Sequence, residues 1–217
     1  MTEDLYHYQT YPVLVIISGP SGVGKDTIAR RLIERRPEDF HFVVTAATRE
    51  PRDGEVEGCD YLFVSNNKFE RMIAENELLE YAVVYEEYKG IPKEQVRIAL
   101  NSGKNMIMRL DVQGAEYVSK LIPSAITVFL RTPTAADLNR RLRSRGKDSN
   151  KKLDIRIKKA GEEMERMQEF CYCVVNADGE QEEAVDQVLN IVDAAHCKVK
   201  QQKIEIVEIN QIKSMPR

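Results

Sequence analysis

The feature that most constrains the fold is an unbroken apolar run at residues 13–17, Val-Leu-Val-Ile-Ile, that ends in a glycine-rich loop. A β-branched run without polar alternation is typical of a strand buried on both faces, as in a parallel sheet. A helical pattern follows over residues 25–36, with aliphatic side chains on one face and Pro37 after its end. A strand, a glycine loop and a helix in this order predict the first unit of an α/β fold.

The same alternation continues along the chain. Apolar segments at 105–110, 125–130 and 172–175 predict further strands, and helical patterns at 94–101 and 153–167 alternate with them. We therefore expect a central parallel sheet with helices around it.

Residues 45–92 interrupt this alternation, because they are rich in charge, glycine and tyrosine. A short strand at 61–64 and a helix near 68–76 are expected within them. This composition favours a subdomain inserted into the α/β core.

The composition excludes several classes of protein. The 217 residues suit one domain, and 32 basic against 35 acidic residues argue against binding nucleic acid through bulk charge. No run approaches the roughly 18 apolar residues of a membrane helix, and residues 1–11 lack the order of a secretory signal. We expect a soluble cytoplasmic protein, or an organellar one if a transit peptide has been removed.

The cysteines lack metal-binding spacing, and we interpret them as buried or incidental thiols in a reducing compartment. They are Cys59, Cys171, Cys173 and Cys197.

The glycine-rich loop matches the phosphate-loop pattern G-x-x-x-x-G-K, with Asp26 at the position where Ser or Thr is expected. In this pattern backbone N–H groups and the helix N-terminus surround a phosphate, and the lysine reaches the terminal phosphate oxygens. The predicted ATP-binding residues here are Gly19, Pro20, Ser21, Gly22, Val23, Gly24, Lys25, Asp26 and Thr27.

Asp26 places a carboxylate beside the predicted triphosphate, and this is repulsive unless a cation lies between them. Mg²⁺ prefers oxygen ligands and is often held by one or two carboxylates together with substrate phosphates. Asp26 is therefore a candidate Mg²⁺ ligand in place of the usual hydroxyl.

A second group of cations predicts a site for a phosphorylated acceptor. Arg49 and Arg52 lie three residues apart with Pro51 between them, and Tyr61 follows. Two guanidinium groups and a phenol suit a phosphomonoester. Residues 140–159 hold ten Lys or Arg against two Asp, which also favours a polyanionic ligand. A nucleic-acid binder is the weakest interpretation, because this segment lacks interleaved aromatic residues.

Several motifs together resemble guanylate kinase. They are the glycine-rich loop, residues 48–63 (T-R-x-P-R-x-G-E-x-x-G-x-x-Y-x-F), 79–82 (L-E-Y-A), 111–114 (D-V-Q-G) and 138–146 (L-x-x-R-L-x-x-R-G). The resemblance covers about residues 13–197. It implies a three-layer P-loop core, a GMP-binding insertion at about 45–92, a lid at about 134–158, and transfer of the ATP γ-phosphoryl group to GMP or dGMP with Mg²⁺.

The resemblance also implies roles for individual residues. Thr45 and Glu80 would read guanine with the help of Asp111, and Asn176 would lie near adenine. Glu80 suits this role, because guanine offers two donor groups to a carboxylate whereas adenine presents an acceptor at N1. The implied GMP-binding residues are Thr45, Arg49, Arg52, Glu55, Tyr61, Glu80, Lys89, Asp111 and Gln113, and the implied catalytic residues are Lys25, Arg141, Arg145 and Arg156.

Besides Asp26, three positions depart from the family pattern. Lys89 and Ile91 replace the tyrosine and the hydroxyl residue of a Tyr-Gly-Ser/Thr motif, which predicts weaker guanine selectivity. Arg109 replaces the first aspartate of Asp-x-Asp-x-Gln-Gly. We interpret Asp26 and Arg109 as a paired exchange, in which a carboxylate is lost on one side of the magnesium ion and gained on the other.

Two alternatives to guanylate kinase remain open. A ribose 1,5-bisphosphate kinase is one, because related kinases have Gly-Lys-Asp in the loop. A non-catalytic guanylate-kinase-like binding module is the other, although such modules usually lack a working phosphate loop. We expect ATP and GMP as ligands, no nucleic acid or membrane partner, and a monomer or homodimer. Residues 198–217 are expected to form an edge strand or a frayed tail and receive no function.

Overall fold

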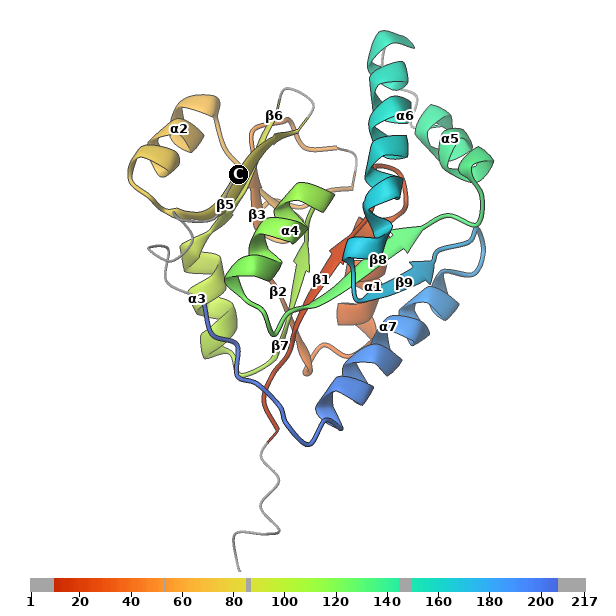
Figure 1. Ribbon diagram of the computed structural model, residues 1–217. Helices are drawn as coiled ribbons and strands as arrows, with labels where there is room; N and C mark the ends of the chain where they lie inside the picture. Colours follow the sequence, from red (N-terminus) through yellow and green to blue (C-terminus); the bar gives the residue numbers. More distant parts are fainter. Residues whose placement is uncertain (1–9, 53, 85–86, 145–149, 207–217) are drawn as a thin grey trace, which may run out of the picture.

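The computed structural model describes residues 10–52, 54–84, 87–144 and 150–206, and its core is a five-stranded sheet in which every pairing is parallel (Figure 1). This confirms the predicted α/β class and central parallel sheet. In spatial order the strands are β2 (Phe40–Phe42), β7 (Asn105–Arg109), β1 (Leu14–Ser18), β8 (Ile126–Arg131) and β9 (Tyr172–Val175).

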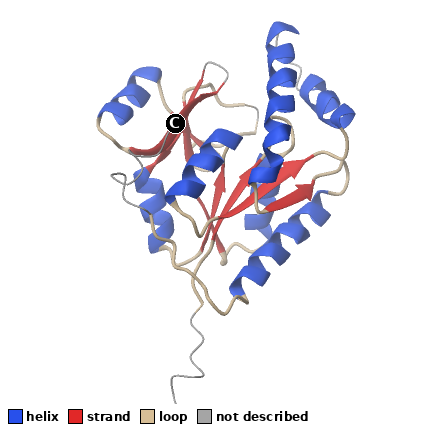
Figure 2. Ribbon diagram, in the orientation of Figure 1, coloured by secondary structure: helices blue, strands red, loops and turns tan. Residues whose placement is uncertain are grey.

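Alternate side chains of β1 enter two separate cores, one on each face of the sheet. Val15 and Ile17 pack with side chains of α1 and α7, whereas Leu14 and Ile16 pack with side chains of α3 and α4. All four are fully buried, as expected for a central strand of a parallel sheet. Helices therefore cover both faces, giving three layers (Figure 2). The helices are α1 (Lys25–Arg35), α7 (Gln181–His196), α3 (Lys93–Asn101) and α4 (Val112–Leu121).

The described residues within 45–92 form a second sheet of four strands with one helix against it. Its strand order is β4-β3-β6-β5, with β3 and β4 parallel and the other pairs antiparallel. Phe69 and Met72 of the helix pack on one face of this sheet, and the ring of Phe69 stacks on Tyr88 with centroids 5.1 Å apart. The elements are β3 (Thr45–Ala47), β4 (Tyr61–Phe63), α2 (Asn66–Ala74), β5 (Leu78–Val84) and β6 (Glu87–Pro92).

Two further helices stand beside each other over the carboxyl end of the central sheet (Figure 1). They are α5 (Ala135–Ser144) and α6 (Asn150–Glu165), and α6 continues into a 3₁₀ helix, η2 (Arg166–Glu169). Leu138 and Leu142 of α5 and Ala160 of α6 join the core that α1 and α7 share. The predicted catalytic residue Arg145 lies outside the described residues.

Some expectations from the sequence were wrong. Residues 198–206 form no strand: Ile204 packs against the core, and the Gln201 side chain accepts a hydrogen bond from the Tyr11 backbone N–H at 2.7 Å. The four cysteines are exposed and carry free thiols, so of the two interpretations, buried or incidental, the first is wrong. Within the described part of the chain, no helix has the length and apolar character needed to span a membrane.

Phe69 tests whether the second sheet depends on its own small core. Because Phe69 is fully buried there, Phe69→Ala is expected to lower the free energy of unfolding by about 3–5 kcal/mol, and Phe69→Leu by roughly 1.5 kcal/mol. Urea denaturation measures both losses, and hydrogen exchange is expected to rise first in β3–β6. A loss below about 1 kcal/mol for the alanine variant would contradict this account.

Candidate active site

The loop between β1 and α1 requires glycine at specific positions. Gly19, Gly22 and Gly24 have φ angles of 128°, 90° and 91°, which side-chain-bearing residues rarely adopt. A Cβ atom on Gly19 would lie 2.2 Å from the carbonyl oxygen of Leu130, and one on Gly24 would lie 2.5 Å from the amide nitrogen of Asn176. The loop therefore keeps this curled shape through its backbone, as a phosphate-binding loop must.

Lys25, the first residue of α1, folds back over this loop. Its Nζ donates hydrogen bonds to the carbonyl oxygens of Gly19 at 2.5 Å and Pro20 at 3.0 Å. The ammonium group is therefore held above the helix N-terminus, where an anion is already favoured by the backbone N–H groups.

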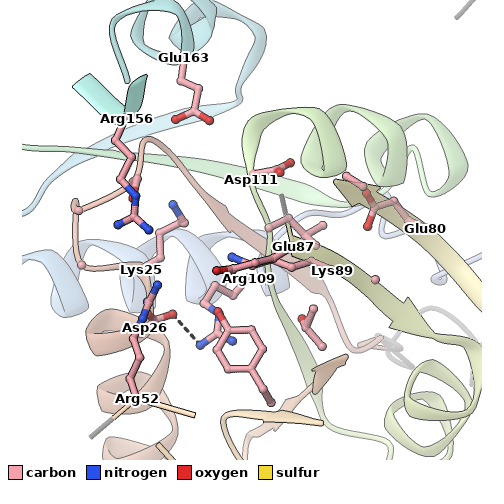
Figure 3. Close-up of a pocket in the computed structure, with 18 residues that line it drawn as sticks. Lys25, Asp26, Arg52, Glu80, Glu87, Lys89, Arg109, Asp111, Arg156 and Glu163 are labelled. Atoms are coloured by element: carbon pink, nitrogen blue, oxygen red, sulfur yellow. Dashed lines mark ion pairs between the residues drawn. The ribbon is translucent and has the colours of Figure 1, made fainter. Parts of the chain in front are cut away.

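A cleft of about 910 Å³, including the part open to solvent, lies between the glycine loop, the second sheet and α6 (Figure 3). It brings together twelve of the residues predicted as sites from the sequence, together with Arg109, Glu87 and Glu163. The lining residues are Ser21, Gly22, Gly24, Lys25, Asp26, Thr45, Arg52, Tyr61, Glu80, Ala82, Glu87, Lys89, Gly90, Arg109, Leu110, Asp111, Arg156 and Glu163.

The predicted phosphate-binding arginines occupy different positions. Arg52 lines the cleft, whereas Arg49 is buried behind it and forms two 2.6 Å hydrogen bonds with the carboxylate of Glu55. The Arg49 guanidinium also lies 4.6 Å from the centre of the Tyr61 ring, which itself faces the cleft. Glu55 accepts a further hydrogen bond from the backbone N–H of Arg52 at 2.8 Å, so one carboxylate ties both arginines together.

The opposite end of the cleft is acidic (Figure 3). Glu80, on β5, is only 9% exposed; burial, with Asp111 nearby, raises the pKa of its carboxyl group to about 8. Asp111 caps α4 by accepting a hydrogen bond from the Gly114 N–H at 2.8 Å. A Cβ atom on Gly114 would lie 3.1 Å from a Glu80 oxygen, so the glycine permits this close approach. Thr45, on β3, lines the same cleft.

Lys89 and Ile91, which depart from the family pattern, lie in different environments. Lys89 lines the cleft, and burial together with nearby Lys25 lowers the pKa of its ammonium group to about 8. Ile91 is only 1% exposed and packs in the core with Leu79 and Val96. The Ile91 side chain is therefore a core residue and forms no part of the cleft lining.

Asp26 and Arg109, the other two departures, form an ion pair. The Arg109 Nη1 lies 2.6 Å from the Asp26 Oδ1, and the arginine side chain is only 5% exposed. Within the described ranges, no group of three or more His, Cys, Asp or Glu is arranged to hold a metal ion. A Mg²⁺ ion carried by nucleotide phosphates needs only one or two carboxylates from the protein, and Asp26 beside Lys25 fits that requirement.

Glu163 is a cleft residue that the sequence analysis missed. It is 8% exposed on α6, and its Oε2 is buried without a hydrogen-bond partner. Burial raises the pKa of its carboxyl group, while Lys25 opposes the shift. The signal in the sequence was its spacing: Glu163 follows Arg156 by seven residues, two helical turns, so both project from the same face of α6.

The remaining predicted site residues lie around the loop. Asn176 follows β9 and donates a 2.7 Å hydrogen bond from its Nδ2 to the Val23 carbonyl, and its buried Oδ1 has no partner. Arg141 donates to the Asn176 carbonyl at 2.8 Å and pairs with Asp178. Thr27 and Gln113 are exposed and do not line the cleft.

Comparison with known proteins agrees with this geometry. The family model described as guanylate kinase matches residues 11–195. A chloroplastic/mitochondrial guanylate kinase 2 of Oryza sativa subsp. japonica is 46% identical, with the match covering 90% of this chain and 68% of the rice protein. A guanylate kinase of Latilactobacillus sakei is 38% identical, covering 86% of this chain and 91% of the relative.

The fold comparison gives the same result. The crystal structure of guanylate kinase from Anaplasma phagocytophilum superposes with a TM-score of 0.71 and 27% identity, covering 88% of this chain and 89% of that one. The chain therefore belongs to the guanylate kinase family.

Proposed function

We propose that the protein transfers the γ-phosphoryl group of ATP to GMP or dGMP, giving ADP and GDP or dGDP. The observation that carries this proposal is the polarity of one cleft: a phosphate loop with Lys25 at one end, and the buried carboxylate of Glu80 at the other. Such a cleft accommodates a nucleoside monophosphate with its phosphate toward Lys25 and its base toward Glu80.

Two parts of the chain, together with Mg²⁺, hold the phosphate groups. The glycine loop and Lys25 bind the ATP polyphosphate, and Asn176 supports the loop beside adenine. Arg52 and Tyr61 bind the GMP phosphate, with Arg49 and Glu55 directly behind them. Mg²⁺, held by Asp26 together with phosphates and water, would neutralise part of the phosphate charge.

The chemistry requires positioning more than proton transfer. The attacking group is itself a phosphate oxygen anion, so no strong base is needed. Arg141 and Arg156, on α5 and α6, are proposed to close with residues 134–158 as a lid and stabilise the transferring group. Closure excludes water, which would otherwise hydrolyse ATP.

Guanine is selected by hydrogen-bond polarity. An ionised Glu80 accepts from the N1–H and N2–H₂ groups of guanine, and Thr45 and Asp111 flank it in the cleft. Adenine presents an acceptor at N1 and would leave the buried carboxylate unpaired, which disfavours AMP. Since Ile91 lies in the core, we propose that selection depends on these three residues. Lys89, which lines the cleft, is proposed to contact GMP as well, whereas Gln113 lies outside the cleft lining, so the structure gives its proposed contact with GMP no support.

Two alternatives are less well supported. A ribose bisphosphate acceptor would give the buried Glu80 no donor groups of a base. A pure binding module would not need the curled glycine loop with Lys25 held above it. We propose that the enzyme acts as a monomer or homodimer in the cytoplasm, or in an organelle, as the name of the rice relative indicates for that protein.

The choice of acceptor is the first test. ATP- and Mg²⁺-dependent ADP formation is measured with GMP, AMP and ribose 1,5-bisphosphate in parallel. We expect kcat/KM for GMP to exceed that for AMP by about a thousandfold or more, because adenine lacks the N1–H and N2–H₂ donors that pair with the Glu80 carboxylate. Turnover with the ribose phosphate alone would favour the first alternative, and no turnover with any acceptor would favour the binding module.

Lys25 and Arg52 are expected to fail in different ways. Lys25→Ala should lower kcat by more than about a hundredfold, because its ammonium group acts on the transferring phosphate. Arg52→Ala should raise the KM for GMP by roughly tenfold or more while affecting the KM for ATP little. The control is Arg71→Ala, an exposed arginine of the same insertion outside the cleft. An unchanged KM for GMP in Arg52→Ala would contradict the phosphate assignment.

Binding of GMP is expected to release a proton from Glu80. With its pKa raised to about 8, Glu80 is mostly protonated at pH 7, and guanine binds the ionised form. Affinity should therefore rise with pH up to about 8. Calorimetry at pH 7 in buffers of different ionisation enthalpy should show release approaching one proton per GMP, and Glu80→Gln should abolish that part of the release. Equal release in both proteins would contradict the role of Glu80.

A further inference from the structure

Arg109 lies where the central sheet meets the second sheet. It is the last residue of β7, beside Ile17 of β1, and is 6% exposed. Its side chain lines the cleft between Asp26 and Lys89 (Figure 3). A buried guanidinium group requires partners for its donors, and the identity of those partners shows which parts of the molecule it joins.

The partners of Arg109 come from both sides of the cleft. Nη1 lies 2.6 Å from the Asp26 Oδ1 at the start of α1. Nη2 donates a 2.9 Å hydrogen bond to the backbone carbonyl of Asp60, which immediately precedes β4. The guanidinium carbon lies 4.1 Å from the centre of the Tyr61 ring and 5.2 Å from that of Phe42. One side chain thus contacts the phosphate loop helix and the segment that carries the acceptor-binding phenol.

The charges at these positions depend on each other. In the family pattern that the chain resembles, position 26 carries a hydroxyl and position 109 a carboxylate; here they carry a carboxylate and a guanidinium. Removing Arg109 would take away the positive charge that lies 2.6 Å from the Asp26 carboxylate and so increase the negative charge beside the polyphosphate. Arg109 without Asp26 would leave a buried positive charge with one partner fewer.

We propose that Arg109 is a positioning residue with two separable effects, and this inference rests on the proposed function. Toward ATP, it neutralises Asp26, so that a carboxylate is tolerated in the phosphate loop. Toward GMP, it fixes Asp60 and Tyr61, so that the acceptor site is held at a set position relative to the loop. Arg109 thereby couples the two nucleotide sites, because it contacts Asp26 on the ATP side and Asp60 and Tyr61 on the GMP side.

The first arm of the test measures ADP affinity by calorimetry in EDTA, which removes any contribution of Mg²⁺. Arg109→Met is expected to weaken ADP binding by about tenfold or more, because it removes the positive charge 2.6 Å from the Asp26 carboxylate. Adding Asp26→Asn in the same chain should restore affinity to within about threefold of the unsubstituted protein, because the repulsive charge is gone. Affinity that is unchanged in the single variant, or unrestored in the double variant, would overturn the pairing.

The second arm measures the KM for GMP at saturating ATP. Arg109→Met should raise it by about tenfold, and Asp26→Asn should not restore it, since the contacts to Asp60 and Tyr61 are still missing. Arg109→Lys keeps a charge beside Asp26 but lacks the planar fork, so it should preserve ADP affinity and still raise the KM for GMP. A KM for GMP that neither Arg109 variant changes would overturn the link to the insertion.

Arg30→Met is the matched control. Arg30 also pairs with Asp60, at 2.8 Å, but its side chain is 53% exposed and lies outside the cleft lining. This variant should leave the affinity for ADP and the KM for GMP unchanged. Thermal unfolding identifies variants that fail to fold. If Arg109→Met fails to fold, Arg109→Lys still tests the proposal. Absence of GMP turnover in the unsubstituted protein would refute the proposed function, whereas normal turnover with unaffected Arg109 variants would refute only this inference.

Discussion

Ion pairs and hydrogen bonds within the protein hold three of the cations in and directly behind the cleft, and the rest of the site depends on this arrangement. Lys25, Arg49, Arg52 and Arg109 would repel one another if they were close together without partners. Asp26 neutralises Arg109, Glu55 ties Arg49 to the backbone of Arg52, and two loop carbonyls hold Lys25. Lys25, Arg49 and Arg109 are therefore held in place, and a phosphate group meets donors that need little reorganisation.

The topology separates this basic end from the acidic end. The glycine loop and Arg109 lie at the carboxyl ends of adjacent parallel strands, β1 and β7, where ligands bind in open α/β sheets. Glu80 comes from the second sheet and meets Asp111 through the close approach that Gly114 permits. A carboxylate that is costly to ionise when buried there becomes useful when a ligand supplies donor groups. The direction in which a nucleotide lies in the cleft follows from this separation of charge.

The sequence predicted the central sheet and the glycine loop because both depend on local signals. The apolar run at 13–17 and the glycines with positive φ angles are decided by burial and backbone sterics within a few residues. The β5–β6 hairpin was missed because Glu80, Glu87 and Lys89 face the cleft and break the apolar pattern. Helix α7 was missed because acidic residues lie between the aliphatic residues of its buried face and make the segment look polar in the sequence.

The departures from the family pattern are accommodated by contacts between segments that are distant in the sequence, and a sequence motif does not show such contacts. Ile91 needs no compensation in the cleft, because its side chain is packed among Leu79 and Val96. Asp26 and Arg109 are 83 positions apart in the sequence numbering. They come within 2.6 Å of each other because β7, which ends at Arg109, pairs with β1, and the loop after β1 leads into α1. An apolar departure is absorbed by packing, whereas a charged departure at a phosphate site requires an opposite charge within contact distance. The charge at position 109 is therefore best understood through Asp26 and Tyr61 together, and not through its own position in a motif.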